Sequence, residues 1–312
     1  MNKKQMLSRF LQIILVLIGI SFLTFILIYM APGDPVRAMF AASGTMPSEA
    51  VMNEIREELG LNDPVLVQYF RWLGNCLKGD FGHSYSTGKP VAQLLSARLW
   101  PTLKLSLLSL ALMMIVAVPL GMLSAVHQNK PIDFIVRGAS FVGVSMPNFW
   151  VGLLLLYFIC LKLGWLPVVS AGGGFKKIIL PAVTLAFAMA SKYTRQVRTA
   201  VLEELHQDYV IGARARGASE KEILWKQVFP NSLLPLITML GLSLGSLLGG
   251  TAVVEVIFGY QGLGNLAVSA ILNYDYNLVQ GYVLWVALIY MVVNLLVDIS
   301  YYLVDPRIRA RS

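Results

Sequence analysis

Six long apolar runs constrain the fold of this chain more strongly than any other feature of its sequence. Each run is long enough, or nearly so, to cross the apolar core of a bilayer as a helix, which takes about 20 residues. The expected spans are 10–31, 103–126, 138–161, 178–191, 233–258 and 283–304. The fourth is short, so we expect lysines at both of its ends to lay their stems in the apolar layer and reach the interface with their amines. The pattern predicts an all-α polytopic membrane protein with six transmembrane helices, a single domain over 1–312.

The composition excludes a soluble globular protein. Hydrophobic residues make up 56% of the chain and charged residues 13%, whereas about 25% of the residues in soluble domains are charged. Lys and Arg number 25 against 17 acidic residues, an excess that would also suit nucleic acid. Basic residues beside membrane spans set the topology first, so we expect no nucleic acid as a partner.

Basic residues also orient the spans. Three of them precede the first apolar run, which is too long for the core of a signal peptide, so we expect a retained span with its N-terminus inside. Counting from there places 126–137, 192–230 and 303–312 in the cytoplasm, and all three segments carry positive residues. Both termini are therefore expected on the cytoplasmic side.

The segment 32–101 is the longest part expected outside the membrane. Pro32-Gly33-Asp34-Pro35 breaks the first span where it leaves the bilayer. Residues 47–69 then predict one helix with an apolar and a charged face. Two interpretations stay open: an amphipathic cap resting on the bundle, or part of a docking face for a substrate-delivering protein.

The longest polar interruption, 203–235, lies between the fourth and fifth spans. An amphipathic helix is predicted over 201–216, because apolar residues recur there every four positions. These are Val201, Leu205, Tyr209 and Ala213. Gly217 follows, and a glycine at this point closes a helix in the left-handed conformation; Arg214 and Arg216 suit the negative end of the helix dipole.

A second helix is predicted directly after the glycine. Ser219 is the expected N-cap, Glu222 completes a capping box, and Pro230 is expected to end the helix. The arrangement is a helix, a tight turn and a helix carried between two spans. A DNA-binding helix-turn-helix would need a basic recognition helix, and this one offers only Lys221 and Lys226.

This stretch resembles the cytoplasmic coupling loop of ABC-importer permeases, the EAA loop. Gly212 and Ala213 match its two alanines, Gly217 matches its glycine, and 228–230 match its apolar-apolar-Pro ending. Ile211 stands where the family usually has Glu, and Gln227 replaces the first apolar residue of the ending. The resemblance implies that 195–230 couples the chain to ATPase subunits. The residues expected to make that coupling are Asp208, Gly212, Ala213, Arg214, Arg216, Gly217, Phe229 and Pro230.

An ordered series of motifs over nearly the whole chain is similar to the permeases of peptide and nickel importers. The series comprises 32–35, 59–61, 63–64, 67–69, 79–82, 84–85, 90–91, 259–264 and 305–307. The resemblance implies an assembly in the bacterial inner membrane, with a second homologous permease, two ATP-binding subunits and an extracytoplasmic substrate-binding protein. ATP and Mg would be bound by the partner subunits, with no cofactor in this chain. Transport would proceed by alternating access.

Three strings bear on the cargo. Residues 143–150, 179–183 and 267–271 look closer to nickel permeases than to dipeptide permeases, so they favour nickel, as an ion or a chelate. Di- or oligopeptides remain the alternative. The spans contain no cluster of His, Cys or Met that would hold a bare transition-metal ion, which counts against a free ion in the membrane.

Gly241, Gly245 and Gly249 recur every fourth residue in the fifth span, a spacing that lets another helix approach closely. With Ser243 they also spell Gly-x-Ser-x-Gly, but a hydrolase needs that serine on a strand-to-helix turn with His and acid partners. The chain has no phosphate-binding G-x-x-x-x-G-K-[ST] loop and no H-E-x-x-H motif. A membrane-embedded enzyme is therefore only a remote alternative, and no metal site is expected.

Polar residues within spans suggest function, because placing them there is costly. Asn294 and Asp298 in the sixth span and Glu255 in the fifth are candidate pathway residues. For Glu255, as for Lys104, we favour interfacial placement or helix pairing, since both side chains can reach the headgroup layer.

Overall fold

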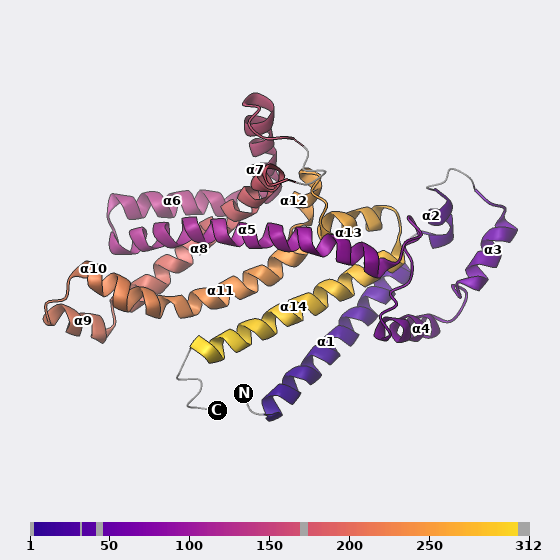
Figure 1. Ribbon diagram of the computed structural model, residues 1–312, viewed down its shortest axis with the longest axis horizontal. Coiled ribbons are helices and arrows are strands. Elements are labelled where there is room, and N and C mark those ends of the chain that lie inside the picture. Colours follow the sequence, from indigo (N-terminus) through magenta and orange to yellow (C-terminus); the bar gives the residue numbers. More distant parts are fainter. Residues whose placement is uncertain (1–2, 32, 42–45, 169–173, 305–312) are drawn as a thin grey trace. The chain divides into compact units, whose positions relative to one another are not determined.

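The computed structural model describes residues 3–31, 33–41, 46–168 and 174–304. Within these ranges the chain is helical and contains no strand, apart from an isolated bridge between His83 and Pro90 (Figure 1). Three described helices are long and apolar enough to cross a membrane, Ser8–Met30, Val91–Val126 and Tyr276–Val297, and a bent pair makes a fourth candidate. The predicted class, an all-α polytopic membrane protein, is confirmed.

The described helices fall into two compact units. The first comprises the described residues of Met1–Thr102 and Gln261–Val292, and the second those of Leu103–Tyr260 and Val293–Ser312. The first unit contains α1 (Lys3–Met30), α2 (Pro35–Ala41), α3 (Glu49–Glu58), α4 (Val65–Leu77), the start of α5 (Val91–Val126), α13 (Leu263–Leu272) and the larger part of α14 (Tyr276–Val304). The second contains the rest of α5 and α14, α6 (Pro131–Ser145), α7 (Asn148–Leu155), η1 (Leu156–Lys162), α8 (Lys176–Leu205), α9 (Asp208–Ala215), α10 (Glu220–Ile223), η2 (Leu224–Val228), α11 (Phe229–Gly250) and α12 (Ala252–Ile257).

The first unit has a buried cluster shared by α5, α13 and α14. Its members are Val91, Leu95, Leu263, Ala270 and Leu278. In the same unit α1 packs on α4, where the ring of Tyr69 lies edge-on to Phe25 with centroids 5.5 Å apart. The Tyr69 hydroxyl also shares a hydrogen bond of 3.0 Å with Ser21. An aromatic contact with a satisfied hydroxyl is a stable way to fix a helix crossing.

The single helix predicted over 47–69 is wrong, because the structure has two helices there, α3 and α4. Gly60 adopts φ +64°, and Pro64 in an extended conformation caps α4. Glycine favours a left-handed break and proline removes a helix hydrogen bond, so these two residues divide the pattern. The predicted apolar face is only partly found: Tyr69 is buried, whereas Val51, Leu59 and Val67 are exposed. The buried residues of these helices are Met52 in α3 and Tyr69 and Cys76 in α4.

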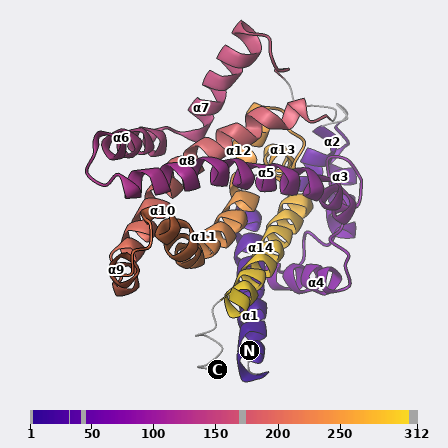
Figure 2. The same ribbon diagram turned by 60° about the vertical axis from the view of Figure 1, so that its left-hand side comes forward.

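Helix α8 is the central helix of the second unit. It contacts α6, α7, α11 and α12, and Figure 2 shows it running beside α6. Ala182, Ala186 and Ala190 are buried at four-residue spacing, a small-residue face that allows close helix packing. Helix α8 extends beyond the span predicted over 178–191 and ends at Leu205. The Lys and Arg residues that follow the predicted span are good helix formers, so they continue the helix.

The span predicted over 138–161 is broken, not continuous. Helices α6 and α7 are bent by 98° at Met146-Pro147. Met146 is extended, at φ −83° and ψ 127°, as the residue before a proline prefers, and Pro147 has no N–H to continue the helix. Pro119 and Pro181 lie inside α5 and α8, which run on through them.

Candidate functional site

The coupling segment, residues 206–230, connects α8 to α11 and begins with a break. Gln207 is extended, at φ −76° and ψ 150°, and acts as the N-cap of α9. The helix predicted over 201–216 is therefore divided into the end of α8 and the separate short helix α9. The apolar positions that predicted it do face the interior, so the periodicity was correct and its continuity was wrong.

The turn between α9 and α10 closes as the sequence predicted. Gly217 adopts φ +82°, and its N–H donates to the carbonyl oxygen of Arg214 at 2.9 Å. The N–H of Ala218 donates to the carbonyl oxygen of Ala213 at 3.1 Å, which completes a Schellman closure. A Cβ at Gly217 would meet nothing within 4 Å, so this position depends on backbone conformation and not on space.

An ion pair spans the turn. Arg214 donates from Nε and Nη2 to the two carboxylate oxygens of Glu220, at 2.7 and 3.0 Å. This hydrogen bonding holds the pKa of Glu220 below its ordinary value. The pair is exposed and contributes little stability, but its two-point geometry fixes the orientation of both side chains. Ser219 caps α10 as predicted, its Oγ accepting a hydrogen bond of 3.3 Å from the N–H of Glu222.

One face of the coupling segment is anchored in the second unit. Val210, Ala213, Ile223 and Val228 are fully or almost fully buried. They share an apolar cluster with residues of α5, α8 and α11, among them Met122, Ala125, Val197, Val201 and Leu236. Interiors of this kind are close-packed and transmit displacement. Helices α9 and α10 are therefore packed against three long helices at once.

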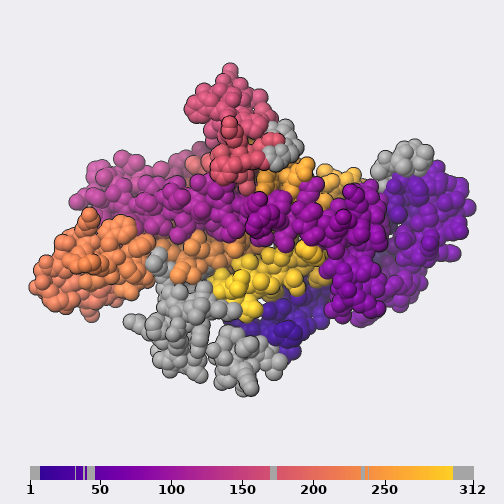
Figure 3. Space-filling model, viewed as in Figure 1, coloured from indigo at the N-terminus to yellow at the C-terminus, as the bar shows by residue number. Residues whose placement is uncertain are grey.

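The opposite face is open, as the orange segment in Figure 3 shows. Asp208, Arg216 and Lys221 are exposed there, and within the described residues they form no ion pair. Two large apolar side chains join them: Ile211 is 59% exposed and Trp225 is 53% exposed. Sequence reasoning noted Ile211 only as a departure from a motif and missed Trp225. Exposed apolar groups among charges are typical of a surface that another protein covers.

Pro230 does not end the second helix, which corrects the prediction. The helix runs without a gap from Glu220 to Gly250, and Pro230 lies in its middle. The turn before it, Leu224–Val228, is π-helical, and this wider turn gives room for the proline ring against the carbonyl one turn earlier. Phe229 is half-buried and packs edge-on to Trp225 at 5.4 Å, while Pro230 itself is exposed. Gly212 is half-buried, and an added Cβ would reach only the Arg216 side chain, at 3.4 Å.

A buried ion pair joins α6 to α8 near this segment, and sequence reasoning missed it. Arg198 donates from Nε and Nη2 to Asp133 at 2.7 and 2.8 Å. The fully buried Asp133 also accepts from the hydroxyl of Ser124 at 2.6 Å and from the N–H of Asn129 at 3.0 Å. Four donors on one carboxylate satisfy its charge and fix the α5–α6 turn to α8.

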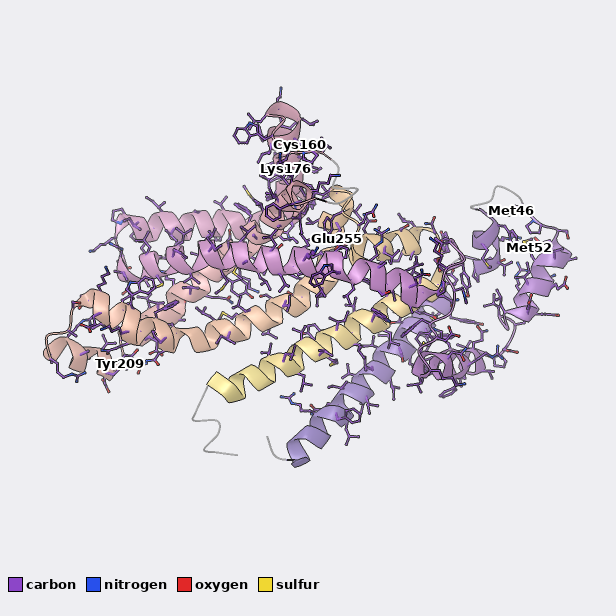
Figure 4. All side chains as sticks on the ribbon, in the orientation of Figure 1. Met46, Met52, Cys160, Lys176, Tyr209 and Glu255 are labelled. Atoms are coloured by element: carbon purple, nitrogen blue, oxygen red, sulfur yellow. The ribbon has the colours of Figure 1, made fainter. Side chains whose placement is uncertain are left out.

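The candidate pathway residues lie on two helices of the second unit, α12 and α14. Glu255 lies in α12 and is fully buried, with its carboxylate accepting a hydrogen bond of 2.9 Å from Thr251. Interfacial placement or helix pairing, the two expectations for Glu255, stays a prediction, although a carboxylate that is satisfied inside the unit need not reach the headgroups. Asn294 is half-buried in α14, and the side chain of Asp298 lies outside the described side chains. Figure 4 shows Glu255 far from Tyr209 of the coupling segment within the second unit.

The three glycines of the predicted packing face differ in their surroundings. A Cβ at Gly241 would collide with the side chain of Val297, so α11 and α14 approach closely there. Gly245 is buried, whereas Gly249 is exposed near the end of α11. Ser243 lies mid-helix and donates to the carbonyl oxygen of Met239, with the Tyr193 hydroxyl also in contact. In the described part of the chain no group of three or more His, Cys, Asp or Glu side chains could hold a metal ion.

Comparisons with known proteins agree on one family. Residues 117–310 match the family described as "Binding-protein-dependent transport system inner membrane component", and residues 3–106 match the family of its N-terminal region. The fold is similar to a solved chain of the MetNI methionine ABC transporter, with a TM-score of 0.59, 20% identity, and 68% of this chain and 97% of that chain covered.

Three relatives align over almost the full length of both chains. The oligopeptide transport system permease protein AppB of Bacillus subtilis is 40% identical, over 97% of this chain and 98% of its own. The probable D,D-dipeptide transport system permease protein DdpB of Escherichia coli is 37% identical, over 95% and 94%. The glutathione transport system permease protein GsiC of Escherichia coli is 36% identical, over 97% and 98%. The chain therefore belongs to the inner-membrane components of binding-protein-dependent transport systems, and it is a permease subunit of an ABC importer, not an enzyme.

Proposed function

We propose that this chain forms one half of the translocation path of an ATP-driven importer of short peptides. A second homologous permease supplies the other half, and two ATP-binding subunits hold ATP and Mg, with no cofactor in this chain. An extracytoplasmic binding protein delivers the cargo. The observation that carries the choice of cargo is the naming of full-length relatives for oligopeptides, D,D-dipeptides and glutathione.

Nickel, which three short strings favoured, becomes the second candidate. Those strings cover a small part of the chain, whereas the peptide relatives align over 95 to 97% of it.

The coupling segment is proposed to receive the ATP-driven movement. Its exposed charges at Asp208, Arg214 and Arg216, together with Ile211 and Trp225, offer a mixed surface for an ATPase subunit. Its buried face and the unbroken helix from Glu220 to Gly250 support transmission to the spans, because no loop separates the contact from α11. The spans then re-pack between inward-open and outward-open states. Asn294 and Asp298 remain candidates for lining the path.

The orientation we propose places both termini and the coupling segment in the cytoplasm, and the segment between α1 and α5 outside. The excess of Lys and Arg next to the inner ends of the spans supports it.

A deletion strain of the source bacterium tests the cargo. We expect loss of this chain to abolish growth on short peptides as an amino-acid source and to leave cellular nickel content under nickel limitation unchanged. A plasmid copy of the wild-type chain should restore peptide use. Normal peptide use together with lowered nickel content would reject the peptide assignment and restore nickel.

A further inference from the structure

The first unit contains a cavity that none of the preceding roles uses. Its volume is ≈ 410 Å³, and its walls come from the end of α1, from α3 and α4, from the loop before α5 and from the first turn of α14. Ligand pockets in proteins typically enclose about 300–1,000 Å³. The cavity is therefore large enough for a small organic molecule.

The walls combine three kinds of group. Both charge signs are present: Arg56 is ion-paired with Asp34 and Arg71 with Asp63, each with further N–H groups to donate, and Asp80 forms no ion pair within the described residues. Side-chain amides line it as well, from Asn75, Asn277 and Gln280. Phe25 and Trp72 add an aromatic part, with their rings 6.0 Å apart. A ligand that matches all three carries a positive end, a negative end, amide groups and some apolar surface.

Two of the lining side chains have buried polar atoms without a hydrogen-bond partner in the described structure. These atoms are the indole Nε1 of Trp72 and the hydroxyl oxygen of Tyr276. Buried polar groups are nearly always paired, so a group left unpaired points to a missing water, ion or ligand. The indole N–H only donates, so what it lacks is an acceptor oxygen.

The backbone beside Tyr276 leaves no room for a side chain. Gly33 lines the same cavity at φ +147°, and a Cβ there would lie 2.9 Å from the Tyr276 hydroxyl and 2.8 Å from the ring of Tyr274. A glycine at this point keeps the Tyr276 hydroxyl uncrowded by its neighbour.

We propose that this cavity binds a short peptide in its zwitterionic form, with Trp72 and Tyr276 donating to a carboxylate or carbonyl oxygen of the peptide. The inference rests on the proposed function and on its orientation, which put the cavity outside the cytoplasm. A free short peptide carries the two charges, the amides and the acceptor oxygens that the walls match. The cavity is a transit site on the permease itself, additional to the site on the binding protein.

The test uses the assembled transporter in lipid nanodiscs without its binding protein, and tri-alanine as the probe. Trp72→Phe and Tyr276→Phe each remove one unpaired polar atom and keep an aromatic ring. Trp165→Phe and Tyr290→Phe, outside the cavity, are the matched controls. We expect saturable tri-alanine binding by calorimetry and an increase in Kd of roughly 3- to 10-fold in each cavity variant, the range expected for one lost hydrogen bond, with no change in the controls.

Folding does not obscure this result. Tyr276→Phe removes only an unpaired buried hydroxyl, so it should keep or raise the thermal midpoint of the wild type. Trp72→Phe also loses ring contact with Phe25 and should lower the midpoint somewhat, so Tyr276→Phe decides the test if Trp72→Phe folds poorly. Amidated tri-alanine should also bind more weakly than the free acid, because one charge is lost. Absence of saturable tri-alanine binding, or equal Kd values in cavity variants and controls, would overturn the site. Weaker docking of the binding protein in both cavity variants without any tri-alanine binding would also overturn it, in favour of a protein loop in the cavity.

Uptake separates this site from the function on which it rests. If the complete wild-type system imports tri-alanine with ATP but neither variant changes tri-alanine binding, the site is rejected and the peptide importer is supported. If both variants weaken tri-alanine binding but the complete system imports no peptide, the site is supported and the proposed cargo is wrong.

Discussion

Asp275 and Ser84 lie 191 positions apart in the chain and share a buried hydrogen bond of 2.5 Å in the first unit. The same carboxylate accepts from the N–H groups of Tyr85 and Ser86, at 3.0 and 3.2 Å, and from the Ser86 hydroxyl at 2.8 Å. All four of these donors are neutral. One carboxylate thus holds the loop before α5 against the turn before α14.

Asp275→Asn should destabilise the first unit. The new amide group would present hydrogens to donors that need an acceptor, and hydrogen bonds to a charged group contribute about 1.5–3 kcal/mol each. We expect a lower thermal midpoint and a lower folded yield in detergent, measured by size-exclusion chromatography after heating. Asp63→Asn is the control, because its pair with Arg71 is exposed and surface pairs contribute about 0–1 kcal/mol. Equal thermal midpoints for Asp275→Asn and Asp63→Asn would show that the hydrogen bonds of Asp275 do not stabilise the first unit.

The coupling turn yields a second prediction. Gly217→Val forces a β-branched residue into a left-handed conformation and should cost about 1–3 kcal/mol of local strain. Arg214→Glu places two like charges across the turn. Both variants should insert normally and should reduce peptide uptake and stimulated ATP hydrolysis together in proteoliposomes. Gly217→Asn is the control, since Asn tolerates this conformation and should keep most activity. Normal uptake in both test variants would exclude the segment from coupling.

Local signals predicted much of this structure, because they depend on residues a few positions apart. The closure at Gly217 and the cap at Ser219 are of this kind, and so is the apolar face of the coupling segment. The break at Pro147 was not predictable in the same way. Pro119 and Pro181 carry the same local signal, yet their helices continue, so only the packing of neighbouring helices separates the cases.

Long-range polar contacts could not be predicted from one sequence. Asp133 and Arg198 are 65 positions apart, and neither lies in a motif that names the other. The sequence shows the charged residue at 133 but not the donor that satisfies it.

The Asp133–Arg198 pair gives a third prediction. Removing one partner of a buried pair typically costs about 3–5 kcal/mol, and partial exposure of Arg198 places the expected value toward the lower end. Arg198→Lys should be nearly as harmful as Arg198→Ala, because an ammonium cannot make the two-point contact. Thermal midpoints of the purified chain would measure this. Arg195→Lys, on the exposed side of the same helix, should change the midpoint little. A fully tolerated Arg198→Lys would show that the second hydrogen bond contributes nothing.

The orientation of the spans is a fourth prediction. Single cysteines at positions 50 and 128 of a Cys-free chain should differ in labelling by a membrane-impermeant maleimide added to whole cells with a permeable outer membrane. Position 50 should react and position 128 should react only after the inner membrane is opened. The reverse pattern would invert the topology and place the coupling segment on the wrong side for any ATPase.

The last prediction concerns acid and the contact between Asp34 and Arg56, which ties the turn before α2 to α3. Burial raises the pKa of Asp34, but the hydrogen bond from Arg56, the N–H of Val36 and the charge of Arg56 outweigh it, and the net pKa lies below the ordinary value of 3.8. A carboxylate with a lowered folded pKa contributes stability that is fully present above its unfolded pKa and is lost as the pH falls through the folded value.

Hydrogen exchange of the α3 amides, corrected for intrinsic rates, should therefore stay constant from pH 7 to pH 5 and rise only below about pH 4. Asp34→Asn lacks the charged contact at every pH, so its α3 amides should exchange faster than those of the wild type already at pH 7. Asp63→Asn, which removes the exposed pair of Asp63 with Arg71 of α4, should leave the exchange of the α3 amides unchanged. A rise in wild-type exchange between pH 7 and pH 5 would contradict the lowered pKa, because the carboxylate would then be protonating well above its ordinary range.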